Sequence, residues 1–168
     1  METIRSWEMA ALDLNCEYFG LSRIQLMENA GKSVADEIKK RFDEGKVTIF
    51  VGSGNNGGDG LVAARFLKDF DVKIVIAKEV KSDLALKNLR ILEEAGFDIV
   101  KWEDFEGRED IIVDALLGTG FRGKLRRPYD EIVDYINDSN AFVVSVDVRA
   151  GWMPTLGNTR KLLRQTSR

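Results

Sequence analysis

Residues 47–60 decide the fold class, and they read Val-Thr-Ile-Phe-Val-Gly-Ser-Gly-Asn-Asn-Gly-Gly-Asp-Gly. The β-branched and aromatic run at 47–51 predicts a buried strand, which leads directly into the glycine-rich stretch 52–60. Glycine lets backbone amides approach a ligand without a Cβ in the way, and the amino terminus of a following helix favours an anion. This stretch is therefore typical of a loop that holds phosphate.

Helical and extended patterns alternate on both sides of this stretch. Upstream, Ser22 and Gln25 have the capping-box spacing and begin an amphipathic helix that ends by Gly45. Downstream, the predicted elements are, in order, a helix over 61–70, a strand over 72–77, a helix over 82–95, strands over 97–100 and 111–116, a helix over 129–137 and a strand over 141–148.

Strands separated by helices of this length predict an α/β fold with a mostly parallel sheet between two helical layers, because parallel strands need crossovers and bury both faces. Ligands of such folds bind at the carboxyl ends of the strands. The segments that follow strands are therefore the candidate site segments: 52–60, 78–80, 114–124 and 147 onward.

Length and composition limit the classes of protein. The 168 residues fit one domain, and with 44% hydrophobic and 32% charged residues the chain can bury a core. The 25 basic and 28 acidic residues give a net charge of −3, which argues against a nucleic-acid partner. No apolar run approaches the roughly 20 residues of a membrane span, and no signal peptide is recognisable, so we expect no membrane partner and a cytoplasmic location.

Cysteine and histidine limit the chemistry. Cys16 is the single cysteine and histidine is absent, which excludes an internal disulfide, the usual zinc sites and imidazole-based triads. Any catalytic acid or base must then be an Asp, Glu, Lys or Tyr residue or Cys16.

The glycine spacing alone leaves several interpretations open. Gly52, Gly54 and Gly57 match the dinucleotide-binding pattern, and Glu79 lies about where a ribose-binding acid is expected, as in a nicotinamide dehydrogenase. The polar pair Asn55-Asn56 and the carboxylate of Asp59 depart from that pattern. A loop that is merely rich in turn residues is the structural alternative.

Four segments together resemble the YjeF N-terminal domain family in order and spacing. They are Leu-Met-Glu-Asn-Ala-Gly at 26–31, Gly-Asn-Asn-Gly-Gly-Asp-Gly-Leu-Val-Ala-Ala-Arg at 54–65, Asp-Ala-Leu-Leu-Gly-Thr-Gly-Phe-Arg-Gly at 114–123 and Val-Ser-Val-Asp at 144–147. The resemblance implies a Rossmann-like three-layer αβα sandwich. It also implies NAD(P)HX epimerase activity, an isomerase reaction that interconverts the R and S forms of hydrated NADH or NADPH so that a dehydratase can repair them.

The resemblance also implies the site residues. It assigns contact with the hydrated nucleotide to Asn55, Asn56, Gly57, Gly58, Asp59, Gly118, Thr119, Gly120, Phe121, Arg122, Gly123, Lys124 and Asp147. It assigns a potassium ion to Asn56 and Asp114, whose oxygens suit a hard cation. The basic cluster Arg122, Lys124, Arg126 and Arg127 either binds substrate phosphates or is an ordinary loop.

Asp147 is the expected catalytic residue. The substrate carries a hydroxyl on a carbon next to the ring nitrogen, so its configuration inverts if water leaves and re-adds from the opposite face. Asp147 would protonate the leaving hydroxyl and deprotonate the returning water, a role that typically contributes about 10²- to 10⁴-fold in rate. The alternative is that Asp147 is a turn or capping residue at the end of a strand.

The family pattern breaks after Asp147. Arg149 stands where the family has proline, and Ala150 stands where it has a serine that helps to hold potassium, which argues against potassium binding. All 28 acidic residues precede Arg149, while residues 149–168 hold five basic ones. We therefore divide the chain into a nucleotide-binding domain at 1–148 and an atypical basic tail at 149–168, either truncated or frame-shifted or naturally divergent.

This break leaves a second function open, a non-catalytic nucleotide-binding or dimerising scaffold of the same fold. The expected partners are NADHX or NADPHX, a second copy of the chain in a homodimer, and a dehydratase that is fused or separate.

Overall fold

A five-stranded, wholly parallel sheet forms the middle layer of the structure, a computed structural model that describes residues 18–118 and 124–146. The elements are, in chain order, α2 (Arg23–Lys39), β1 (Lys46–Val51), α3 (Asn55–Phe66), β2 (Asp71–Ile76), α4 (Asp83–Glu94), β3 (Asp98–Lys101), the 3-10 helix η1 (Trp102–Asp104), β4 (Ile111–Ala115), α5 (Tyr129–Asp138) and β5 (Phe142–Ser145). The predicted α/β fold class is confirmed.

The strand order is β3-β2-β1-β4-β5, with every neighbouring pair parallel. From β1 the chain moves outward through β2 to β3, then returns to the other side of β1 to form β4 and β5. The order of the strands therefore reverses between β1 and β4. Ligands of open α/β sheets bind in the crevice beyond the carboxyl ends of the strands at this kind of point.

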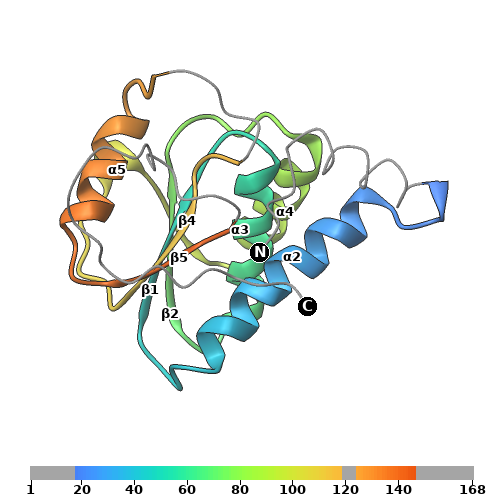
Figure 1. The fold of residues 1–168 in the computed structure, drawn as a ribbon, viewed down its shortest axis with the longest axis horizontal. Coiled ribbons are helices and arrows are strands. Elements are labelled where there is room, and N and C mark those ends of the chain that lie inside the picture. The colour runs from blue at the N-terminus through green and yellow to red at the C-terminus, as the bar shows by residue number, and fades with distance from the viewer. Residues whose placement is uncertain (1–17, 119–123, 147–168) are drawn as a thin grey trace, which may run out of the picture.

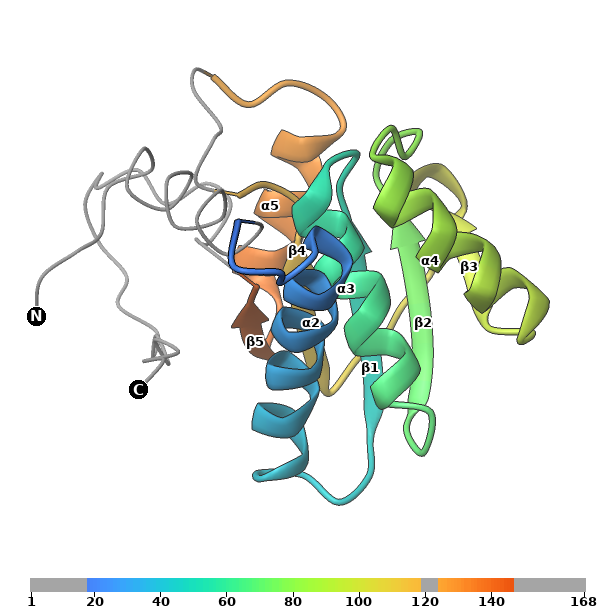
Figure 2. The ribbon, with the colours of Figure 1, turned by 90° about the vertical axis from the view of Figure 1, so that its right-hand side faces the viewer.

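Helices cover both faces of the sheet. Figure 1 shows α5 on one side of the sheet and α2, α3 and α4 on the other. Figure 2 shows α2, α3 and α4 side by side over one face of the sheet. The chain thus forms the predicted three-layer sandwich. Among residues 18–118 and 124–146, no helix is both long and apolar enough to cross a bilayer.

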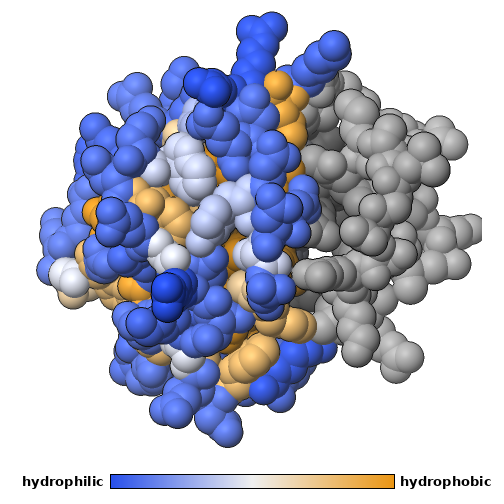
Figure 3. All heavy atoms as spheres, turned by 90° about the vertical axis from the view of Figure 1, so that its left-hand side faces the viewer, coloured by the Kyte–Doolittle hydropathy of each residue, from blue (hydrophilic) through white to orange (hydrophobic). Residues whose placement is uncertain are grey.

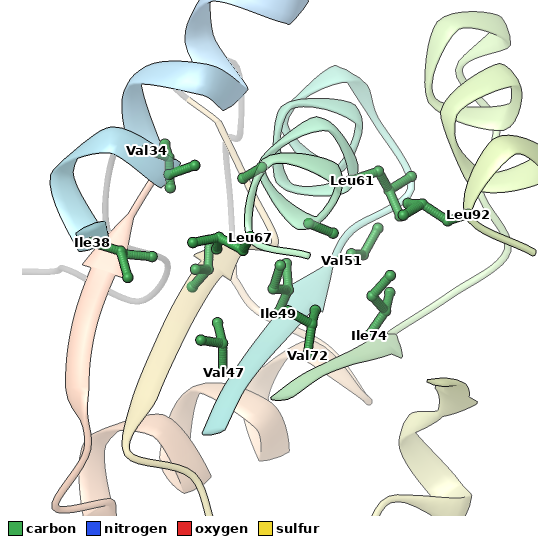
Figure 4. Packing of buried hydrophobic residues seen from close by; sticks show 14 of the residues in the cluster. Val34, Ile38, Val47, Ile49, Val51, Leu61, Leu67, Val72, Ile74 and Leu92 are labelled. Carbon is green, nitrogen blue, oxygen red and sulfur yellow. The ribbon is translucent and has the colours of Figure 1, made fainter. Parts of the chain in front are cut away.

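The core has two parts because alternate residues of each strand face opposite layers. Ile49 and Val51 of β1 pack toward α2, α3 and α4 with Val34, Leu61 and Leu92 (Figure 4). Phe50, between them in sequence, packs toward α5 with Ile132 and Ile136. Burial on both faces explains why β1 reads as a continuous apolar run.

Helix α3 begins at Asn55 and not near residue 61, so the prediction of a loop over the whole glycine-rich stretch was wrong. The glycines permit close packing of α3. A Cβ on Gly57 would lie 2.2 Å from the carbonyl oxygen of Gly52, and one on Gly60 would lie 2.5 Å from Cβ of Ala115. Glycine costs about 1 kcal/mol per residue in a helix. Packing against the sheet outweighs that propensity here.

Candidate functional site

Helix α3 starts without a side-chain cap. Its N-cap is Gly54, with φ −102° and ψ −164°, which has no side chain to accept a hydrogen bond from the first turn. By contrast, Ser22 caps α2 and Ser82 caps α4 through their hydroxyl groups. The first N–H groups of a helix have no partner within the helix, and they carry partial positive charge. The start of α3 is therefore arranged to donate hydrogen bonds to an anion or another acceptor.

This uncapped start lies where β1 and β4 end side by side. The Gly52 N–H donates to the carbonyl of Ala115 at 3.0 Å. A Cβ on Gly52 would lie only 1.8 Å from the carbonyl oxygen of Leu116. Only glycine fits such a close backbone approach. The glycine at position 52 thus joins the two strand ends at the point where the strand order reverses.

Asn56 sits in the first turn of α3 and is only 9% exposed. Its side-chain Nδ2 is buried and has no hydrogen-bond partner among residues 18–118 and 124–146. A buried amide donor left without a partner costs about 1 to 3 kcal/mol. Such groups in native proteins call for an explanation, and a ligand that supplies an acceptor would remove this cost.

Asp114 is the other buried polar residue of the predicted site. It lies in β4, is 1% exposed, and accepts the Leu116 N–H at its Oδ1 at 3.2 Å. Its neighbours across the sheet are Phe50 in β1 and Ser145 in β5. Asp114 is near the carboxyl end of β4, and Asn56 is in the first turn of the helix that follows β1, so both residues lie at the carboxyl edge of the sheet.

The loop between β2 and α4 supports the start of α3. The carbonyl of Ser53 accepts the N–H of Lys81 at 2.9 Å and that of Ser82 at 3.3 Å. The Ser82 hydroxyl donates to Oδ1 of Asn55 at 2.5 Å, and the same hydroxyl caps α4. Asn55 therefore has a structural partner, and Ser82 couples α4 to the candidate site.

Tyr129, the first residue of α5, supports the same turn from the opposite layer. The Ser53 N–H donates to Tyr129 Oη at 3.3 Å, and the Tyr129 hydroxyl donates to Ser53 Oγ at 3.3 Å. Lys78 Nζ lies 5.6 Å from the centroid of the Tyr129 ring, as in a cation–π contact. Ser53 is thus held from both helical layers, by the loop before α4 and by Tyr129 of α5. Tyr129 also contacts the Lys78 ammonium at this edge of the sheet.

The other predicted site residues divide into three groups. Gly57 and Gly58 are buried, and a Cβ on Gly58 would lie 2.5 Å from Cε of Met27, so packing explains both glycines. Asp59 and Gly118 are half-buried, and Lys124 is exposed, as is Glu79 in the loop after β2. The remaining candidates lie outside the described residues: Thr119, Gly120, Phe121, Arg122, Gly123, Asp147, the divergent position Ala150, and Cys16.

Sequence reasoning missed Ser53, Ser82 and Tyr129. Ser82 was noted only as the start of a helix, and the contact between Ser53 and Tyr129 joins residues 76 positions apart. The position of Tyr129 directly after Pro128, at the start of a helix that follows the β4 strand, was the one available signal.

The arrangement is suited to a nucleotide. Unpaired N–H groups at a helix start bind phosphate oxygens, and the buried Asn56 amide can read a carbonyl or hydroxyl group. In the described parts of the chain no three His, Cys, Asp or Glu side chains form a cluster that could hold a metal ion.

Comparison with known proteins points to one family. The family model described as "YjeF-related protein N-terminus" matches residues 23–164. Among solved structures, the crystal structure of the yeast protein ynu0 is similar with a TM-score of 0.82 and 28% sequence identity, over 90% of this chain and 72% of that one.

Curated relatives carry names that describe an activity. The "Bifunctional NAD(P)H-hydrate repair enzyme Nnr" of Archaeoglobus fulgidus is 56% identical over 98% of this chain and 35% of its own length. The protein of the same name from Methanothermobacter thermautotrophicus is 43% identical over 89% of this chain and 32% of its own length. The "NAD(P)H-hydrate epimerase" of Plasmodium knowlesi is 45% identical over 83% of this chain and 50% of its own. The chain thus spans about a third of the first two relatives.

Proposed function

Because the chain belongs to the family of YjeF-related protein N-termini, we propose that it is an NAD(P)H-hydrate epimerase, an isomerase that interconverts the R and S forms of NADHX and NADPHX. The observation that carries this proposal is the uncapped start of α3 beside the buried Asn56 amide, whose Nδ2 has no hydrogen-bond partner among the described residues. Both lie where β1 and β4 end side by side and the strand order reverses. The names of the similar proteins supply the substrate class.

Binding follows from the geometry at the start of α3. The N–H groups of Asn55, Asn56 and Gly57 donate hydrogen bonds to the oxygens of a substrate phosphate, and the helix dipole adds to that attraction. The Asn56 Nδ2 donates to an acceptor on the ribose or the nicotinamide carboxamide. The two glycines at 57 and 58 let α3 pack closely enough to present these groups at the sheet edge.

The chemical step uses a carboxyl group. As the C–O bond of the hydrate breaks, the lone pair of the ring nitrogen forms a C=N bond, and Asp147 donates a proton so that water leaves. Water then adds to the opposite face of the cation and returns its proton to the Asp147 carboxylate. This role for Asp147 rests on its place in the sequence directly after Val146, whose N–H donates to the carbonyl of Asp114 at 3.0 Å.

A potassium ion is part of the proposal. The amide oxygen of Asn56 and the carboxylate of Asp114 are oxygen donors at the same sheet edge, a donor set that fits a hard cation. When bound, the ion would neutralise charge on the substrate phosphates. Asn56 and Asp114 would hold it, while the α3 N–H groups orient the nucleotide. Ala150 supplies no side-chain ligand, so the remaining ligands would be backbone carbonyls, water or substrate.

Other features stay predictions from the sequence. They are the cytoplasmic location, the homodimer, a dehydratase that is fused or separate, and the division of the chain at residue 148.

Chromatographic separation of the two epimers tests the function. Pure R-NADHX incubated with the chain is expected to reach a mixture of R and S forms much faster than in buffer, without change in nicotinamide oxidation state. Asp147→Asn is expected to lower kcat by about 10²-fold or more while leaving KM nearly unchanged. Wild-type epimerisation by Asp147→Asn would remove this residue from the mechanism, and hydride transfer in the same mixture would favour a dehydrogenase.

A further inference from the structure

A pocket of about 550 Å³ lies outside the candidate site, between the end of β3 and the start of α5. Its lining residues are Trp102, Glu103, Arg127, Pro128 and Glu131. It is a wide depression that is open to solvent, so a flat ligand could lie against its wall. The pocket has an aromatic and acidic lining and lies beyond the carboxyl end of β3. None of its lining residues belongs to the site around Asn56.

We propose that this pocket binds the adenosine half of the dinucleotide substrate, with the adenine ring against Trp102 and its exocyclic amine donating to the carboxylate of Glu103. The inference rests on the proposed function, because that function supplies a substrate with two nucleoside halves. The site around Asn56 takes the hydrated nicotinamide half, so the adenosine half needs a second subsite along the same edge.

Trp102 is held in place for stacking. Its ring stacks on Phe105 with an interplanar angle of 26°, and it meets Phe50 and Tyr135 edge-on. Its Nε1–H donates to Glu131 Oε2 at 3.4 Å. These contacts fix the ring while leaving it half-buried at the pocket. A fixed aromatic ring at a pocket wall is the usual platform for a nucleobase.

The charge of the pocket selects a neutral base with a donor group over a phosphate. Glu103 and Glu131 are both acidic, and the one basic lining residue, Arg127, is already paired through its Nε with Glu131 Oε1 at 2.9 Å. A phosphate would meet net negative charge there. Adenine carries an exocyclic NH₂ group that can donate a hydrogen bond to a carboxylate. In this proposal Arg127 supports Glu131, while its assignment to phosphate binding or to an ordinary loop stays a prediction from the sequence.

The two subsites are connected through Tyr129. Pro128 of the pocket is followed directly by Tyr129. The Tyr129 hydroxyl donates a hydrogen bond to Oγ of Ser53, next to the start of α3. The Lys78 ammonium lies over the same tyrosine ring. In this proposal the pyrophosphate of the dinucleotide passes Tyr129, near the Lys78 ammonium.

The surrounding surface favours a small ligand over a protein partner. On the face that carries α5, shown in Figure 3, hydrophilic side chains predominate and hydrophobic areas are small and separated. Protein interfaces usually show a larger contiguous apolar patch.

Substrate truncation combined with mutation tests the proposal. Initial epimerisation rates of the intact chain are measured with NADHX and with hydrated reduced nicotinamide mononucleotide, which lacks adenosine. Trp102→Leu is expected to lower kcat/KM for NADHX by about tenfold, the scale of a lost base–aromatic stack. It should leave the mononucleotide rate within about twofold. An equal loss on both substrates, or no loss on NADHX, would overturn the proposal.

Calorimetric binding of AMP and of nicotinamide mononucleotide gives a readout that does not need epimerase activity. Trp102→Leu should weaken AMP by about tenfold and leave the mononucleotide unchanged. If Trp102→Leu weakens AMP in this way but the wild-type chain does not epimerise NADHX, the proposed function is refuted and the adenosine subsite stands. AMP binding that Trp102→Leu does not alter would refute the subsite and leave the proposed function standing.

Two neighbouring exposed acids in η1 provide a second test in case Trp102→Leu does not fold. Glu103 lines the pocket and Asp104 does not, and both are exposed. Replacing either by Ala removes one negative charge, which alone would tighten AMP. Glu103→Ala is expected to weaken AMP several-fold through the lost hydrogen bond, whereas Asp104→Ala should not weaken it. Equal effects of the two variants would contradict the proposed contact.

Discussion

Gly52 and Gly54 are two glycines of the same turn with opposite surroundings. A Cβ at Gly52 would lie 1.8 Å from the Leu116 carbonyl oxygen, whereas a Cβ at Gly54 would have nothing within 4 Å. Gly52→Ala must push β1 and β4 apart and is expected to lower the free energy of unfolding by about 3 kcal/mol or more. Gly54→Ala should cost less than about 1 kcal/mol. Urea denaturation of both variants measures the difference, and similar losses would refute the close approach.

Asn56 and Asn88 are buried asparagines with opposite hydrogen-bond states. Asn56 Nδ2 has no partner in the part of the chain that the structure describes, whereas Asn88 Nδ2 donates to the Leu84 carbonyl at 3.1 Å. Asn56→Leu is expected to keep or raise stability by about 1 kcal/mol while abolishing nucleotide binding, because the residue serves a ligand and not the fold. Asn88→Leu should lower stability by about 1 to 3 kcal/mol. Thermal unfolding and nucleotide titration of both variants check this, and a large loss of stability in Asn56→Leu would count against it.

Tyr135 is expected to lower the free energy of unfolding as the pH rises above about 10. Burial, and then the hydrogen bond from its hydroxyl to Glu109 Oε1 at 2.7 Å, raises the pKa of Tyr135 well above its usual value near 10. Above about pH 10 the unfolded chain releases this proton while the folded chain keeps it, so the folded state loses stability as pH rises. Tyr135→Phe should cost about 1 kcal/mol at neutral pH and give a shallower alkaline decline.

Urea denaturation at about pH 8 and pH 11 measures the difference between Tyr135→Phe and the wild type. Tyr18→Phe, which alters an exposed tyrosine, is the control for losing a phenol group. Parallel alkaline declines of wild type and Tyr135→Phe would contradict this account.

At the scale of elements, Ser22 and Ser82 play the same capping role on different helices. Ser22 caps α2 in a capping box, and Ser82 caps α4 and also donates to Asn55. Alanine at either position is expected to lower stability by about 1 kcal/mol. Only Ser82→Ala should also raise the KM for NADHX, several-fold, because it frees Asn55 at the start of α3. Equal KM values for the two variants would show that Ser82 does not influence nucleotide binding through Asn55.

Element types and order were predictable because each strand and each amphipathic helix carries its own periodicity. The capping box at Ser22 and Gln25 is a local signal, and the structure confirms it. The start of α3 was predicted wrongly, since glycine propensity favours a loop and the packing partners of Gly57 and Gly60 lie in β1 and β4. Contacts distant in sequence decided this boundary.

At the scale of the whole molecule, the carboxyl edge was predictable as the candidate site because parallel topology places the carboxyl ends of all strands together. Burial of Asn56 without a partner, and the ties from Ser82 and Tyr129 to one turn, were not readable from the sequence. They depend on how three helices and two strands meet. The pocket at Trp102 escaped prediction for the same reason, since η1 and α5 contribute its walls from separate parts of the chain.

The central claim is that the uncapped start of α3 receives the hydrated nucleotide. Two-dimensional amide NMR of isotope-labelled chain, titrated with NADHX, locates the bound ligand directly. The account predicts the largest saturable shifts at the backbone N–H groups of Asn55, Asn56 and Gly57 and at the side-chain amide of Asn56, with Asn88 unchanged. Saturable shifts confined to the opposite, amino-terminal edge of the sheet, with the α3 start unaffected, would contradict it.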